Sequence, residues 1–151
     1  MLNWRKPPPQ DYLKYWRVVR YFIKAKYGLT QPELEILLFL YSEKYFSKDK
    51  FDEFDELISW DEDRFDKLLR DEWLNVFRKK VGNRRTVYEL SYKARRVIGL
   101  VYKKLNGEEL PEHPSVNPLF KNSASYMDTV YRNYMKEMNK FIRQERHRSR
   151  E

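Results

Sequence analysis

The feature that most limits how this chain can fold is a change of apolar spacing at residues 73–90. Elsewhere apolar residues recur at the intervals typical of helices, over residues 12–27, 34–45, 51–57, 65–69 and 92–105. Residues 73–79 instead alternate in the manner of a strand, and residues 86–90 are rich in β-forming side chains. A turn at residues 81–85 separates the two, so the pattern predicts a β-hairpin set among helices.

Capping residues indicate where several of these helices begin. Thr30 and Glu33 form the pattern of a capping box, with a proline between them in the first turn. Ser59 begins a similar pattern, and Ser91 precedes the helix that follows the hairpin. The short helix before Ser59 and the helix after it would join at a tight turn at residues 58–59, which is a helix-turn-helix pattern.

These elements predict a mainly α fold with a small β-hairpin, in the α+β class. Helix, helix, helix-turn-helix, hairpin and helix is the order of a winged helix-turn-helix domain, and a C-terminal helical arm follows it. We expect an extended N-terminal segment at 1–10, the winged-helix domain at 11–107, a proline-containing linker at 108–124, an amphipathic helix at 125–146 and a disordered basic tail at 147–151.

Over roughly residues 12–105 the chain resembles the MarR (multiple antibiotic resistance regulator) family. The residues that carry the resemblance are Leu29–Glu33 and the stretch from Arg84 to Ala94. In that family's pattern Arg84 matches the wing arginine that enters the minor groove, and Gly82 replaces the aspartate that usually braces it. The resemblance implies a DNA-binding transcriptional regulator that dimerises through its terminal helices.

The positive charge of the chain is unevenly distributed. The formal net charge is +8 and the isoelectric point is about 9.5. Residues 30–71 carry 13 acidic and 6 basic side chains, for a net charge of −7. The net charge is +6 over residues 1–29, +6 over residues 72–110 and +3 over residues 111–151. A polyanionic partner should therefore meet the hairpin and the two ends of the chain, although each basic run could also be a solvated face.

The hairpin cations are the strongest candidates for contact with DNA. Like charges crowded near one turn repel one another and so favour a polyanionic partner over mere solubility. The expected wing contacts are Arg78, Lys79, Lys80, Arg84 and Arg85. A second set, expected to contact flanking phosphates, is Arg64, Lys67, Arg70, Lys93 and Arg96.

The helix that would enter the major groove is acidic at its start. Carboxylates beside phosphates weaken DNA binding, although they also stabilise a helix N-terminus through the helix dipole. A second hypothesis is therefore a protein-interaction module on the winged-helix scaffold, for a basic surface on a polymerase or on a viral assembly such as that of a bacteriophage. The residues that would carry it are Asp61, Glu62, Asp63 and Asp66.

The last helix carries an apolar stripe with heptad spacing. The stripe could fold back on its own domain, or it could pair with a second copy of the chain in a homodimer. Its members are Met127, Tyr131, Tyr134, Met138 and Phe141. The Lys and Arg residues of 132–150 could contact phosphate, but a solvated face is the favoured interpretation of that run.

Enzymatic and metal-dependent functions find no support in the sequence. It has no Gly-rich phosphate loop and no Ser/His/Asp spacing, and with no cysteine and two histidines it offers little for a metal site. We therefore expect no catalytic residue, no metal and no cofactor. The longest apolar run is residues 36–41, too short to span a membrane. The expected location is the cytoplasm, in association with the nucleoid, or the host cytoplasm or virion if the protein is viral.

Overall fold

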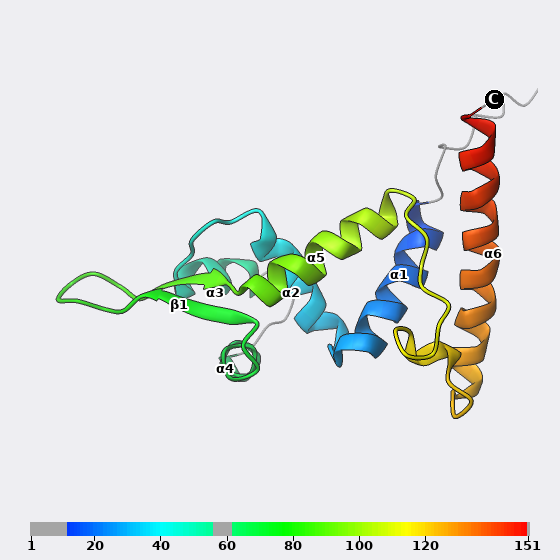
Figure 1. Cartoon of the computed structure of the whole chain (residues 1–151). Helices are drawn as coiled ribbons and strands as arrows, with labels where there is room; N and C mark the ends of the chain where they lie inside the picture. The colour runs from blue at the N-terminus through cyan, green and yellow to red at the C-terminus, as the bar shows by residue number, and fades with distance from the viewer. Residues whose placement is uncertain (1–11, 56–61, 151) are drawn as a thin grey trace, which may run out of the picture. The chain divides into compact units, whose positions relative to one another are not determined.

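The structure is a computed structural model that describes residues 12–55 and 62–150. It is mainly helical with one small antiparallel sheet of two strands, as the sequence predicts. In chain order (Figure 1) the elements are α1 (Tyr12–Tyr27), α2 (Gln31–Tyr41), α3 (Lys48–Asp55), α4 (Glu62–Arg70), β1 (Leu74–Arg78), β2 (Val87–Leu90), α5 (Tyr92–Leu105), the short 3-10 helix η1 (Pro118–Phe120) and α6 (Tyr126–Arg148). The expected turn at 58–59 lies outside the described residues.

The chain divides into two compact units. One is Leu29–Leu100, and the other joins the described residues up to Gly28 with those from Val101 onward. Helix α5 contributes to both units. The sequence pattern predicts that α1 and the hairpin belong to one domain at 11–107, whereas the structure groups α1 with α6. The physical reason is direct packing, since α1, η1 and α6 contact one another.

Helix α2 ends earlier than its apolar pattern predicts. The pattern continues to Tyr45, but the helix stops at Tyr41. The chain then turns so that Phe46 pairs with Tyr88 of β2 through two backbone hydrogen bonds of 3.0 and 2.8 Å. A backbone that pairs with a strand must leave the helical conformation, and this partner is far away in the sequence. The bridge attaches the segment before α3 to the hairpin.

An aromatic cluster holds the helices of the Leu29–Leu100 unit against its hairpin. The ring of Phe65 on α4 meets the rings of Phe51 on α3 and Tyr88 on β2 edge to face, each at a centroid distance of 4.9 Å. Phe51 and Phe65 are almost fully buried. Edge-to-face contact is a favoured arrangement of aromatic rings and adds to the gain from burying them. The cluster fixes the position of the hairpin within its unit.

In the other unit, α6 begins at a complete capping box and extends further than expected. The Ser125 side chain accepts a hydrogen bond from the Asp128 backbone, and the Asp128 side chain accepts one from the Ser125 backbone. Residues 147 and 148, expected in a disordered tail, are helical. Cations in the last turn of a helix interact favourably with its dipole, which stabilises this extension.

The segment predicted as a linker is attached to α6. Asn139 of α6 is fully buried, and its side-chain amide makes two hydrogen bonds of 2.8 Å to the backbone N–H and carbonyl of Leu110. Asn117 caps η1 and donates to the carbonyl of Pro111 at 2.9 Å. Leu110 and Leu119 are buried. Residues 108–124 therefore form part of the packed unit.

Candidate nucleic-acid interface

The hairpin presents a well-defined turn. The backbones of Val81 and Arg84 exchange two hydrogen bonds of 3.2 and 3.0 Å, which close the turn around Gly82 and Asn83. Gly82 has a φ of +58°, whereas Asn83 does not have a positive φ. Glycine at the first central position with positive φ is the pattern of a type II′ turn, whose twist suits a hairpin. Gly82 thus sets the turn and, through it, the place of Arg84.

Four of the five wing cations lack an ion pair. Within residues 12–55 and 62–150 the side chains of these cations are exposed and make no salt bridge: Arg78, Lys79, Lys80 and Arg84. The connection between β1 and β2, which carries Lys79, Lys80 and Arg84, extends beyond the helices of its own unit in Figure 1. A projecting group of exposed cations can approach a polyanion without first breaking internal contacts.

The fifth wing cation, Arg85, has a partner within the chain. Its guanidinium forms an ion pair with the carboxylate of Asp49 on α3. The side chains are 70% and 63% exposed, so the pair contributes little to stability and can exchange for another anion. The structure therefore connects the basic turn to the acidic helix beside it.

The second basic set is divided by the structure. Lys67 lies 2.8 Å from the carboxylate of Glu33, whose side chain is buried. Lys93 donates to the carbonyl of Asp71 at 2.8 Å and lies 4.1 Å from the centre of the Trp73 ring. These two lysines therefore have structural contacts.

The remaining members of this set lie on two helices of the Leu29–Leu100 unit. Arg70 and Arg96 are exposed, on α4 and α5, and Arg64 is half-buried on α4. The structure thus leaves Arg70 and Arg96 as the more accessible members of the second set.

The Glu33–Lys67 contact gives both side chains roles that differ from the predicted ones. The Glu33 backbone donates to the Thr30 side chain at 3.3 Å, so half of the expected capping box forms. The Glu33 carboxylate accepts a hydrogen bond from Lys67, and this bond, followed by charge attraction, raises the pKa of Lys67. Because Glu33 holds its side chain, Lys67 has a structural role in the fold.

Acidic side chains on α4 face solvent. Asp63 and Asp66 are exposed and have no ion pair within the described part of the chain. Glu62 is the first residue of α4, and Asp61 lies outside the described residues. The part of the acidic cluster that the structure describes is accessible to a basic partner.

The two aromatic side chains expected to pack the hairpin onto the domain are buried to different extents. The alternating pattern predicts that Trp73 and Phe77 both make this contact. Trp73 is buried, whereas Phe77 is 51% exposed and its ring lies 4.2 Å from that of Tyr45, which precedes α3. Both side chains therefore contact the domain, Trp73 in the core and Phe77 at the surface.

The apolar stripe of α6 is split between two environments. Tyr131 stacks on Tyr21 of α1 at 3.9 Å, and Met138 is buried. These residues fold back on their own chain. In contrast, Met127, Tyr134 and Phe141 are 52%, 46% and 45% exposed.

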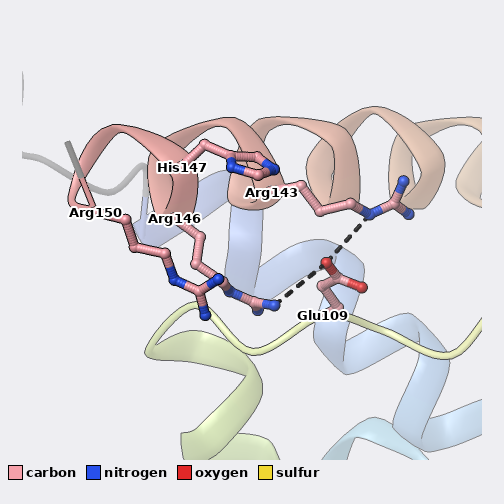
Figure 2. A pocket seen from close by; sticks show the side chains of 5 residues that line it. All are labelled: Glu109, Arg143, Arg146, His147 and Arg150. Atoms are coloured by element: carbon pink, nitrogen blue, oxygen red, sulfur yellow. Dashed lines mark hydrogen bonds and ion pairs between the residues drawn. The ribbon is translucent and has the colours of Figure 1, made fainter.

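A basic cluster at the end of α6 falls within the run 132–150, for which the sequence favours a solvated face over phosphate contact. Arg143, Arg146, His147 and Arg150 line a cavity with Glu109 (Figure 2). Their spacing of three, four and seven residues puts them on one helical face, which is the sequence signal that could have identified them.

Residues 12–55 and 62–150 lack the features of a metal centre and of a membrane-spanning helix. These residues contain no group of three or more His, Cys, Asp or Glu side chains that could hold a metal ion. None of their helices has both the length and the apolar character needed to cross a membrane.

Comparison of the whole chain with protein-family models, with curated proteins and with solved structures finds no match.

Proposed function

We propose that this protein binds double-stranded DNA through the β1–β2 hairpin and acts as a transcriptional regulator of the winged-helix type. The observation that carries the proposal is the set of hairpin cations that are exposed and have no ion pair among the described residues: Arg78, Lys79, Lys80 and Arg84. The element order of the Leu29–Leu100 unit supports the winged-helix assignment, since two short helices precede the hairpin and α5 follows it. The proposed role is binding and not catalysis.

In this proposal the turn and the strand that leads into it have different tasks. Arg84, held at the tip by the Val81 bridge, enters the minor groove, where the negative potential attracts an arginine side chain. Lys79 and Lys80 neutralise phosphates, and each phosphate contact releases counterions. The exposed carboxylates Asp63 and Asp66 disfavour close approach of α4 to the same backbone. Base readout by α4 is accordingly a minor part of the proposal.

Salt dependence of binding to generic duplex DNA tests the proposal. Fluorescence anisotropy at several salt concentrations should show that log K falls with log salt by about 0.9 for each phosphate neutralised. The Lys79→Gln/Lys80→Gln variant should lower this slope by about 2. Lys121→Gln/Lys140→Gln, which removes two exposed cations from the other unit, is the matched control. Absence of duplex binding at low salt, or equal effects of the two variants, would refute the proposal.

A dimer is an additional proposal that the exposed part of the α6 stripe supports. Met127, Tyr134 and Phe141 recur every seven residues and are about half exposed. Two copies could bury them against each other, and a two-fold dimer would match a palindromic DNA site. Measuring the mass of the protein in solution tests this, and a monomer at high concentration would exclude it.

The alternative is a protein-interaction module, which the accessible acidic residues of α4 favour. Charge reversal in an Asp63→Lys/Asp66→Lys variant should abolish capture of a basic protein partner while leaving the fold intact. The result that supports the module over the DNA-binding proposal is loss of that partner in a protein that shows no duplex binding. Retained capture by the variant would exclude this use of α4.

A further inference from the structure

We propose that the end of α6 and the segment beside it form a binding site for a phosphoryl group. The site is lined by Arg143, Arg146, His147 and Arg150, with Glu109 at its wall. It lies in the unit that contains α1 and α6, so it is separate from the hairpin. This inference does not depend on the proposed contact between the hairpin and DNA.

The geometry brings several cationic side chains to one cavity. The cavity has a volume of about 260 Å³, enough for a small multiply charged anion. Figure 2 shows the guanidinium groups of Arg146 and Arg150 on the side of α6 that faces Glu109. Guanidinium groups are planar and can offer two parallel N–H donors to phosphate oxygens.

The charges around the cavity are not balanced among the residues that the structure describes. One carboxylate oxygen of Glu109 lies 3.1 Å from Nε of Arg143 and 3.8 Å from Nη1 of Arg146. Arg143 has a second carboxylate, that of Glu112, at 2.9 Å. Within residues 12–55 and 62–150, the Arg146 side chain therefore has only the longer contact.

The two remaining lining residues lack even such a contact. The side chains of Arg150 and His147 make no ion pair or hydrogen bond with the described residues. An anion would supply the charge that this group lacks.

The wall of the cavity is held in place by buried hydrogen bonds. The two bonds from Asn139 to Leu110 attach the segment to α6 about one turn before Arg143. Lys104, which is buried, donates to the backbone carbonyl of Glu109 at 2.6 Å. These bonds fix the backbone that carries Glu109, so this wall of the cavity has little ordering cost on binding.

The helix dipole gives a simpler explanation for part of this cluster. Cations are stabilised in the last turn of any helix, and that effect alone could place Arg146 and His147 here. The dipole does not account for a walled cavity, for one carboxylate shared by two guanidinium groups, or for Arg150 beyond the end of the helix. These observations together support a bound anion.

Calorimetric titration of the full chain with inorganic pyrophosphate at low salt tests the inference. We expect saturable binding, and a loss of affinity of about tenfold or more in Arg146→Gln/Arg150→Gln, because two charged donors are removed. Lys121→Gln/Lys140→Gln removes the same charge from exposed positions outside the cavity and should change the affinity much less. Glu109→Gln should raise the affinity about threefold, because a competing negative charge is lost.

A second arm with duplex DNA distinguishes the source of the phosphoryl group. If Arg146→Gln/Arg150→Gln weakens both ligands, the site accepts backbone phosphates; if it weakens pyrophosphate alone, the ligand is a small phosphorylated molecule. Either result supports the site. It is overturned if the unaltered protein shows no pyrophosphate binding below about 1 mM, if the control variant loses as much affinity, or if Glu109→Gln weakens binding. Failure of the hairpin to bind DNA would leave the pyrophosphate readouts unchanged.

Discussion

Lys67 of α4 reaches the buried carboxylate of Glu33 at the start of α2, with 2.8 Å between its ammonium nitrogen and the nearer oxygen. The two residues are 34 positions apart in the sequence. Lys67 was expected to contact phosphate, but in the structure it compensates a negative charge inside the protein. A buried charge without a partner is costly, so removing Lys67 tests how much this contact of α4 stabilises the fold.

We expect Lys67→Met to lower the thermal unfolding midpoint, because Glu33 is then left buried without its partner. The double variant Lys67→Met/Glu33→Leu should recover most of the loss, since both polar groups are removed together. Differential scanning calorimetry of the two variants checks this, with Arg70→Met as an exposed control on α4. A double variant no more stable than Lys67→Met would contradict the expectation.

The Arg85–Asp49 ion pair leads to an expected gain of DNA binding. In Asp49→Asn the guanidinium of Arg85 loses its partner and becomes available to a phosphate. The affinity for duplex DNA should rise, and the salt dependence should steepen by up to about 0.9. Asp52→Asn removes the same charge from an exposed position on α3 and should have a smaller effect in the same anisotropy titration. Equal changes in both variants would mean that net charge alone is responsible.

The Asn139 side chain should contribute strongly to stability. Asn139→Ala leaves the backbone N–H and carbonyl of Leu110 without their side-chain partners, at a cost of about 2–4 kcal/mol in unfolding free energy. Asn133→Ala, at an exposed position of the same helix, should cost far less. Urea denaturation measures the difference. Similar unfolding free energies for the two variants would show that the hydrogen bonds between Asn139 and Leu110 do not stabilise the unit.

The Tyr21–Asp128 hydrogen bond predicts a loss of stability at high pH. Burial, followed by the hydrogen bond to Asp128, raises the pKa of Tyr21 from 10.0 to about 12. Because the folded state holds this proton more tightly than the unfolded state, the contribution is fully present below pH 10 and is lost as the pH rises toward 12. Unfolding experiments should show a smaller decline over this interval in Tyr21→Phe. An identical decline in both proteins would contradict the assignment.

Local patterns predicted the elements of this fold well, because helical spacing, strand alternation and capping are properties of neighbouring residues. The cap at Ser91 forms as expected, with the Ala94 backbone donating to its hydroxyl at 3.1 Å. The predicted end of α2 was wrong because Phe46 pairs with Tyr88, and no pattern within α2 indicates a partner so far away in the sequence.

Charge alone could not distinguish structural cations from available ones. Lys67 and Arg84 look equivalent in the sequence, yet Lys67 has a buried partner and Arg84 is exposed without one in the described residues. Whether a cation is structural or available depends on long-range contacts such as the one between Lys67 and Glu33. The spacing of its basic residues indicates that one face of α6 is basic. The cavity also needs Glu109, whose position depends on the packing of residues 108–111.

The pairing of α1 with α6 has a consequence for the order in which the chain can fold during synthesis. Tyr21 and its partner Asp128 are 107 residues apart. At the usual pace of translation, the ribosome needs about 5 to 20 s to cover that distance. By the time Asp128 is made, every residue of the Leu29–Leu100 unit has already been synthesised, whereas α1 still lacks the helix that covers Tyr21. Among the described helices, α1 is therefore made first but is one of the last to complete its packing.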